Sequence, residues 1–302
     1  MDESKGPLGH IAALATVTIW GGSFLAIVTL LNDFSPFEII FFRFLLATAM
    51  LYLIYPKPMG KLTRKQHLTF AGAGFAGVTV YFLMQDFALI HTQASNVGVI
   101  VAVSPMFTGL LAWMLRRSGR PSGWFFLGFF VAICGISAIR FSEQTLSINA
   151  LGDFLAVLAA LSWAVYCMFT ERISGFGYHT IQTTRRIFLY GLAFLTPTML
   201  LSDFSFDISR FATVPNIASI LFLGIGPSAL CFVFWNFAVK RLGPVKTTLY
   251  IYLVPLITVV VAVSFLDEVL STVQIIGIAL AISGLLISNI KSKAPTTKTL
   301  EG

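Results

Sequence analysis

Two ionisable side chains lie inside long apolar stretches of this sequence, Arg43 in PFEIIFFRFLLA and Asp86 in YFLMQDFALI. A charge inside an apolar span is expensive unless it faces water, a partner or a bound molecule. A guanidinium binds a carboxylate through two parallel hydrogen bonds, so Arg43 is a candidate for holding the acidic group of a small molecule. Two other interpretations stay open: an ion pair with Asp86 that closes one end of a passage, or an arginine that reaches out to lipid headgroups.

Aromatic and hydrogen-bonding side chains accompany these charges in the same kind of apolar stretch. Trp20 and Trp163 lie near the middle of their stretches, although tryptophan usually marks the ends of membrane-spanning helices. Stacking against an aromatic or apolar substrate would explain both residues, and so would ordinary helix packing. The further candidates for binding a substrate are Tyr81, Gln85, Tyr166, Trp235, Asn236 and Tyr250.

Three more residues are candidates for the moving parts of the protein. Pro105 and Pro255 each remove a backbone hydrogen bond and tend to kink a helix, so we interpret them as hinges. Arg186 joins Arg43 and Asp86 as a candidate gate residue. The alternative for Arg186 is an ordinary anchor at the membrane surface.

The sequence offers no catalytic or metal-ligating set. Its carboxylates stand in predicted loops or near the ends of apolar stretches, and its four histidines lie near such ends. The three cysteines, inside apolar stretches, have the pattern of small buried hydrophobes. An enzyme embedded in the membrane would need clustered acid, base or metal-binding groups within its spans. We therefore predict neither an enzyme nor a cofactor nor a metal.

The elements that must position these residues are membrane-spanning helices. Of the 302 residues, 57% are hydrophobic and only 11% are charged, against roughly 25% charged in soluble domains. Because backbone groups must be satisfied internally in lipid, runs this apolar are helices. We predict an all-α integral membrane protein of about ten spans, each long enough to cross ~30 Å of hydrocarbon: 11–31, 37–55, 68–90, 94–115, 121–140, 151–170, 180–201, 214–239, 244–266 and 272–290.

The basic residues predict how these spans are oriented. With a cytoplasmic N-terminus, 17 of the 20 Lys and Arg residues fall in loops on the inner side and two on the outer side. Short cytoplasmic loops carry the excess of positive charge, so both termini are predicted to be cytoplasmic. The formal net charge of +7 does not indicate a nucleic-acid partner, because the basic residues are spread over these short loops.

The sequence repeats itself weakly. A shift of 143 pairs Trp20 with Trp163 and Arg43 with Arg186, and a shift of 150 pairs Pro105 with Pro255. Five helices per repeat is an odd number, so the second repeat must be inverted. We predict repeats over 1–145 and 146–290 and a cytoplasmic tail over 291–302. Inverted repeats are a recurrent transporter architecture, with the substrate site near the midplane where the halves meet.

Nearly the whole chain also resembles a known family. The segments IWGGSFLA, LSWAVY and WNFAVKRLGPVKTTLYIYLVPLITVVVAVSFLDEVL are similar to EamA-type members of the drug/metabolite transporter superfamily. One departure is visible: Arg116-Arg117-Ser118 stands where an acidic residue usually follows the fourth span, although the second copy keeps Asp267-Glu268.

Within that superfamily the chain most resembles the YddG-type exporters. The resemblance implies a secondary transporter that exports aromatic and other neutral amino acids from the cytoplasm by alternating access, across a bacterial inner membrane. Its partners would be a small-molecule substrate and the lipid bilayer, and it would be a monomer or a weak dimer. Export of drug-like cations or other small metabolites is the alternative within transport, and a channel or membrane-embedded enzyme is the alternative from a different class.

Overall fold

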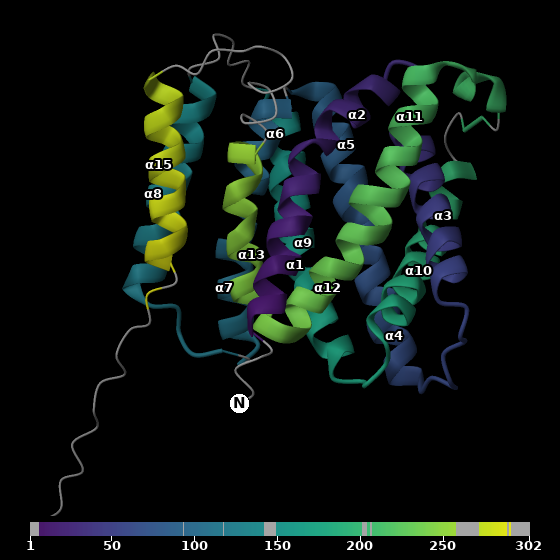
Figure 1. The fold of residues 1–302 in the computed structure, drawn as a ribbon, viewed down its shortest axis with the longest axis horizontal. Coiled ribbons are helices and arrows are strands. Elements are labelled where there is room, and N and C mark those ends of the chain that lie inside the picture. Colours follow the sequence, from purple (N-terminus) through teal and green to yellow (C-terminus); the bar gives the residue numbers. More distant parts are fainter. Residues whose placement is uncertain are drawn as a thin grey trace, which may run out of the picture.

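The computed structural model describes residues 6–92, 94–116, 118–141, 149–200, 204–205, 207–257, 272–288 and 290. Within these ranges the chain forms helices and turns and contains no strand, as the sequence predicts. Figure 1 shows the helices standing side by side, with the N-terminus at the face that we call lower and with α8 and α15 as a pair at one side. The α-helices are α1 (Gly6–Gly21), α2 (Ser23–Leu30), α3 (Pro36–Ile54), α4 (Arg64–Gly74), α5 (Tyr81–His91), α6 (Ala94–Val101), α7 (Ser104–Met114), α8 (Gly123–Phe141), α9 (Ala150–Ser174), α10 (Thr180–Leu200), α11 (Val214–Leu223), α12 (Cys231–Leu242), α13 (Pro244–Thr248) and α15 (Thr272–Ser288).

Five helical stretches of the described residues are long and apolar enough to cross a membrane: Pro7–Leu30, Pro36–Ile54, Arg64–His91, Ala150–Ser174 and Val214–Leu242. Shorter apolar helices cover Gly123–Ala138, Pro244–Ile257 and Ile275–Ser288. Helix α10 is 21 residues long, but it begins with the polar sequence TIQTTRR and is not among the five. The second part of the predicted span 244–266, most of the predicted repeat boundary at 142–150, and the tail 291–302 lie outside the described residues.

Irregular turns interrupt several of these stretches. Gly22 separates α1 from α2, and residues 102–103 separate α6 from α7, which begins beside Pro105. Pro255 lies just after the 3₁₀ turn η5 (Leu249–Leu253). Both prolines therefore lie next to a helix irregularity, in agreement with the kinks that the sequence predicts.

Two π-helical segments occupy comparable places in the chain. Segment η2 (Phe75–Val80) joins α4 to α5, and segment η4 (Gly224–Leu230) joins α11 to α12. Their separation matches the repeat offset of about 150 residues that the sequence indicates. Such bulges occur frequently at functional sites. Here η2 leads into α5, which lines the central cavity described below, and η4 leads into α12, which packs beneath it.

Local sequence signals fix the start of α3, which carries Arg43. Ser35 and Glu38 form a capping box, in which the Ser35 N–H donates to Glu38 Oε2 at 2.7 Å and the Glu38 N–H donates to Ser35 Oγ at 3.4 Å. Pro36 occupies the first helical position, where its missing N–H costs nothing. Arg43 then follows Glu38 about 7 Å deeper into the bundle, at 1.5 Å per residue.

Glycines let the helices of the two halves approach closely. A Cβ placed on Gly77 would lie 2.1 Å from Tyr166 Cδ2 of α9, and one on Gly74 would lie 2.7 Å from the Ile187 carbonyl oxygen of α10. The glycine-rich stretch AGAGFAG, 71–77, thus allows close packing of helices.

Helices α8 and α15 pack against each other in the same way. A Cβ on Gly128 would lie 2.6 Å from the Gly284 carbonyl oxygen, and one on Gly135 would lie 2.5 Å from the Gly277 carbonyl oxygen. The glycine near the start of α8 thus contacts the glycine near the end of α15, and the later glycine of α8 contacts the earlier glycine of α15. The two helices are therefore antiparallel. A shift of 149, one less than the repeat offset of 150, pairs Gly128 with Gly277 and Gly135 with Gly284, so each glycine contacts the repeat mate of the other.

Candidate functional site

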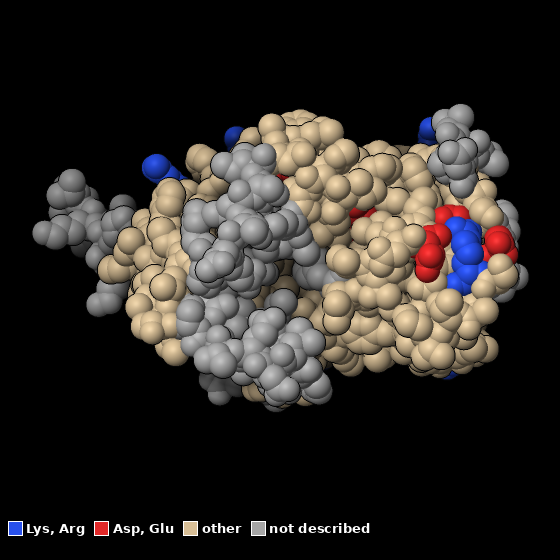
Figure 2. All heavy atoms as spheres, turned by 90° about the horizontal axis from the view of Figure 1, so that it is seen from above, with Lys and Arg blue, Asp and Glu red and all other residues tan. Residues whose placement is uncertain are grey.

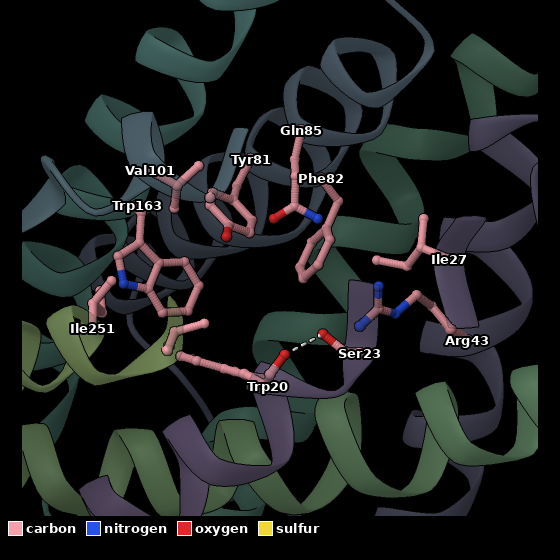
Figure 3. A pocket seen from close by; sticks show the side chains of 12 residues that line it. Trp20, Ser23, Ile27, Arg43, Tyr81, Phe82, Gln85, Val101, Trp163 and Ile251 are labelled. Atoms are coloured by element: carbon pink, nitrogen blue, oxygen red, sulfur yellow. Dashed lines mark hydrogen bonds between the residues drawn. The ribbon is translucent and has the colours of Figure 1, made fainter. Parts of the chain in front are cut away.

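A cavity of about 60 Å³ lies among the helices of the central bundle (Figure 3). Its walls come from α1, α2, α3, α5, α6 and α9 and from the segment that follows α13, so both halves of the sequence contribute. The lining residues are Trp20, Ser23, Ile27, Arg43, Tyr81, Phe82, Gln85, Gly98, Val101, Trp163, Ile251 and Val254.

Arg43 supplies the positive charge of the cavity wall. Its side chain is only 2% exposed, and its Nε donates to Ser228 Oγ of η4 at 2.9 Å. The guanidinium carbon lies 4.5 Å from the centre of the Phe82 ring, which provides cation–π stabilisation. Among the described residues Nη1 has no hydrogen-bond partner. Because Arg43 lines the cavity, its guanidinium brings a buried N–H donor without a described partner to the cavity wall.

Three tryptophans form an aromatic layer at one end of the cavity. The ring centroids of Trp20 lie 5.3 Å from Trp163 and 5.1 Å from Trp235, and those of Trp163 and Trp235 lie 5.5 Å apart. Phe232 and Tyr166 pack on the same group. Edge-to-face and tilted pairs at these distances are the arrangements that aromatic rings favour.

The aromatic layer lies on the lower side of the cavity. Helices α2 and α5 run toward the upper face, and the cavity residues Ser23, Ile27 and Gln85 come after Trp20 and Tyr81 along them (Figure 1). The cavity therefore extends from the tryptophans toward the upper face.

A chain of hydrogen bonds closes the lower side beneath the aromatic layer. The Tyr166 hydroxyl of α9 donates to Asn236 Oδ1 of α12 at 2.7 Å, and Asn236 Nδ2 donates to Thr184 Oγ1 of α10 at 2.9 Å. The Thr184 hydroxyl in turn donates to the Thr180 carbonyl oxygen at 2.9 Å. Three helices are thus tied together below the tryptophans by buried, mutually satisfied polar groups.

Gln85 and Asp86 form the polar part of the α5 wall. Asp86 is fully buried, and its Oδ1 accepts a hydrogen bond from Gln85 Nε2 at 3.2 Å. Its second oxygen, Oδ2, has no hydrogen-bond partner among the described residues. Arg43 and Asp86 interact electrostatically, but no ion pair joins them in the described part of the chain. The pairing that the sequence suggested as one option is therefore not formed in this structure.

The loops at the upper face are joined by an upper clamp, which consists of Arg210, Glu38, Asp33 and Asn216. Arg210 Nη2 donates to Glu38 Oε1 at 2.7 Å, Arg210 Nη1 donates to the Asp33 carbonyl oxygen at 2.9 Å, and Asn216 Nδ2 donates to Asp33 Oδ2 at 2.7 Å. Figure 2 shows this basic group flanked by acidic side chains at one end of the upper face. The hydrogen bond with Glu38 raises the pKa of Arg210 above its ordinary value.

The lower face has a corresponding lower clamp, in which Arg185 and Gln182 of α10 hold the turn after α3. Arg185 donates to the carbonyl oxygens of Tyr55 at 2.7 Å and Lys57 at 2.9 Å, and Gln182 Nε2 donates to the Pro58 carbonyl oxygen at 3.0 Å. The sequence repeat had drawn attention to Arg186. Its neighbour Arg185 is the buried residue that makes these contacts, and Arg186 is half-buried.

The structure brings five of the sequence-predicted residues together around the cavity: Trp20, Arg43, Tyr81, Gln85 and Trp163. Trp235, Tyr166 and Asn236 instead pack in or beneath the aromatic layer. Tyr250 contacts His10, with its hydroxyl 2.5 Å from Nδ1, away from the cavity lining. Sequence reasoning missed Ser23, Ile27, Phe82, Gly98, Val101, Ile251, Val254 and the Arg43 partner Ser228, because in stretches this apolar no periodicity marks the face that turns inward.

Within the described residues, no group of three or more His, Cys, Asp or Glu side chains is arranged to hold a metal ion.

Comparison with protein families assigns the chain. A model of the EamA-like transporter family matches residues 7–141 and again residues 150–290. The chain belongs to this family. It is a transporter and a multi-pass membrane protein, and the two successive matches cover nearly all of its length.

Curated relatives agree with this assignment. An uncharacterized transporter of Archaeoglobus fulgidus is 29% identical over 93% of this chain and 97% of that protein. The "Probable terminal-alkyne amino-acid exporter" of Streptantibioticus cattleyicolor is 29% identical over 92% of each chain. The transporter YetK of Bacillus subtilis is 25% identical over 96% of this chain. One solved crystal structure has a TM-score of 0.73 over 96% of this chain and 97% of that chain at 18% sequence identity, a likeness of fold alone.

Proposed function

We propose that this transporter exports aromatic and other neutral amino acids from the cytoplasm of a bacterial cell, and that the cavity beside Arg43 is the substrate site. The observation that carries the proposal is the buried guanidinium with a free donor next to an aromatic layer. A carboxylate satisfies the guanidinium, and an aromatic or aliphatic side chain packs on the tryptophans. The name of the exporter from Streptantibioticus cattleyicolor supports the same class of substrate.

The proposal includes ten membrane-spanning helices in two inverted repeats, with both termini in the cytoplasm. The antiparallel α8–α15 pair supports the inversion, because the repeat-related glycines contact each other's mates. The two π-helical segments and the two matches to the family support the repeat itself. The lower face is then cytoplasmic, and the aromatic layer with the Tyr166–Asn236–Thr184 chain separates the cavity from the cytoplasm.

Movement of helices is part of the proposal. At about 60 Å³ the cavity is far smaller than the ~300–1,000 Å³ of pockets that hold drug-sized ligands. The helix irregularities beside Pro105 and Pro255, at related positions in the two halves, are the proposed hinges for widening it. The two clamps are the proposed gate contacts, with Arg185 rather than Arg186 at the lower face.

Export of drug-like cations is the second candidate, since an aromatic layer also binds cations. The buried positive charge of Arg43 on the cavity wall repels such a substrate, so the cavity favours one that carries a carboxylate.

The test is transport by purified protein in proteoliposomes with Arg43→Gln and Arg43→Lys. Loss of a charge-assisted hydrogen bond corresponds to roughly a 10-fold to 100-fold loss of affinity, so flux of labelled L-phenylalanine at low concentration falls by that factor in Arg43→Gln. Arg43→Lys keeps the charge without the bidentate geometry and loses less. Arg172→Gln, an exposed arginine at the end of α9, is the matched control and stays at wild-type flux. Equal flux in Arg43→Gln and the wild type would contradict the proposal.

A further inference from the structure

We propose that the cavity recognises the ammonium group of its substrate through Gln85, whose carboxamide is held in one orientation by Asp86. The inference rests on the proposed function and deepens it, because it restricts the substrate to zwitterionic α-amino acids. Arg43 on α3 takes the carboxylate, and Gln85 on α5 takes the ammonium. Gln85 is thus a specificity-determining residue and Asp86 a positioning residue behind it.

The argument begins with the single hydrogen bond between Gln85 and Asp86. In the structure Gln85 turns its NH₂ group toward Asp86, and Nε2 donates to Oδ1 at 3.2 Å. The carbonyl oxygen Oε1 of the same planar carboxamide must then point the other way. Figure 3 shows this oxygen on the Tyr81 side of the residue, among the side chains that line the cavity.

Within the described part of the chain, Gln85 Oε1 is a hydrogen-bond acceptor that no donor satisfies. Among the residues that the structure describes, none donates a hydrogen bond to Gln85 Oε1, and the residue lines the cavity. Gln85 is only 4% exposed, so bulk water does not replace the missing donor freely. A substrate ammonium carries three N–H donors and fits this acceptor. A second carboxylate, or an ester, would bring only acceptors.

Apart from its electrostatic interaction with Arg43, the hydrogen bond from Gln85 is the described contact of the Asp86 carboxylate. A fully buried carboxylate is costly, and no ion pair with Arg43 compensates for it in the described residues. Its negative charge lies behind the carboxamide, which strengthens the attraction of the α5 wall for a positive group. The positive charge of Arg43, on the α3 wall, attracts a negative group of the substrate in the same way.

The surroundings of Asp86 contain few other ionisable groups. Helix α3 contributes Arg43 and, at the upper face, Glu38, which is engaged by Arg210. Helix α9 carries Asp153 in its first turn and, much further along, Tyr166, Cys167, Glu171 and Arg172, and α5 itself carries Tyr81 and His91. Helix α6 and the segment η2 have no ionisable residue. Arg43 therefore stands on the cavity wall, and Asp86 lies one hydrogen bond away from it, next to the lining residue Gln85.

The test compares three ligands of the same size: L-phenylalanine, 3-phenylpropionate, which lacks the ammonium, and phenethylamine, which lacks the carboxylate. Competition against labelled L-phenylalanine is measured with the full-length wild type and variants in proteoliposomes. In the wild type, 3-phenylpropionate competes roughly 10-fold to 100-fold more weakly than L-phenylalanine, the factor of one charge-assisted hydrogen bond. Phenethylamine competes more weakly still, because it lacks the carboxylate that Arg43 binds and its positive charge is repelled by the guanidinium.

Variants at Gln85 separate recognition from folding. Gln85→Met keeps the length of the side chain and removes the acceptor, so the preference for L-phenylalanine over 3-phenylpropionate collapses. Gln85→Glu keeps acceptor oxygens and retains the preference. Gln66→Met makes the same substitution in the capping box of α4, outside the cavity and both clamps, and leaves the preference unchanged even where it lowers the amount of folded protein.

Asp86→Asn tests the positioning role. An asparagine can donate as well as accept, so Gln85 loses its fixed orientation. The affinity for L-phenylalanine falls while that for 3-phenylpropionate does not, whereas a merely structural defect would weaken both together. If the wild type binds L-phenylalanine and 3-phenylpropionate equally well, the inference is overturned and amino-acid export stands. If folded wild type binds no amino acid at all, the proposed function itself fails.

Discussion

Removal of Arg210 tests whether the upper clamp holds the two halves of the molecule together. The guanidinium joins Glu38 at the start of α3, the Asp33 carbonyl in the preceding turn and the Ser205 carbonyl before η3 (Ile208–Ala212). It also lies 4.6 Å above the centre of the Phe34 ring. Arg210→Ala removes all of these contacts at once.

The expected loss follows from the burial of Glu38. That side chain is 2% exposed, and among the described residues its carboxylate keeps the N–H donors of Ser35 and Ser205 when Arg210 is removed. Breaking a buried ion pair costs about 3–5 kcal/mol, and an exposed pair contributes about 0–1 kcal/mol. Because the Arg210 side chain is 24% exposed and two donors remain, we expect a destabilisation of about 2–3 kcal/mol.

The assay is thermal unfolding of purified protein in detergent micelles, combined with a double-mutant cycle that uses Glu38→Gln. At about 2–4 °C per kcal/mol for a chain of this order of size, Arg210→Ala lowers Tm by about 4–12 °C. The double variant is less destabilised than the sum of the two single variants, because the second change removes a charge that no longer has a partner. A Tm shift below about 1 °C for Arg210→Ala would refute the reasoning, since the clamp would then behave as an ordinary surface pair.

Three further predictions concern the packing and the lower closure. Gly77→Ala places a Cβ 2.1 Å from Tyr166 Cδ2 and destabilises the protein by about 1–3 kcal/mol in the same thermal assay. The control Gly60→Ala, where no atom lies within 4 Å of the added Cβ, is nearly neutral. Asn236→Leu breaks the Tyr166–Asn236–Thr184 chain and lowers the free energy of unfolding by about 1–3 kcal/mol. Tyr166→Phe leaves Asn236 with its hydrogen bond to Thr184 and lowers it by less, and equal losses in the two variants would contradict this order. Gln182→Ala frees the turn after α3, which speeds proteolysis at 55–63 without changing ligand preference, and an unchanged cleavage rate would count against the lower clamp.

The broad architecture could be predicted from the sequence, because composition and run length decide it. The apolar stretch 37–55 became α3 (Pro36–Ile54), and 151–170 lies within α9 (Ala150–Ser174). The repeat pairs Trp20 with Trp163 in the sequence, but their contact in the structure, with ring centroids 5.3 Å apart, was not predicted. The glycine contacts of 71–77 followed from residue size alone.

Which residues line the cavity could not be predicted in the same way. In stretches where nearly every residue is apolar, the pattern does not distinguish the inward face, so Ile27, Val101 and Ile251 carry no signal. The partner of Arg43 depends on the π-helical turn that presents Ser228, and no composition rule marks such a turn. Asn236 and Trp235, predicted to bind substrate, belong to the closure beneath the cavity, because their helix α12 runs toward the lower face.

The most direct test of the account is saturable exchange of labelled L-phenylalanine by purified protein in proteoliposomes, for the wild type, Trp163→Ala and Trp113→Ala. Trp163 lies in the cavity wall, and Trp113 is a tryptophan at the end of α7 with 44% exposure, so the pair controls for the loss of an indole. The account predicts exchange in the wild type and in Trp113→Ala and a loss of at least about 10-fold in Trp163→Ala. Undiminished exchange in folded Trp163→Ala would contradict the claim that this cavity is the route of the substrate.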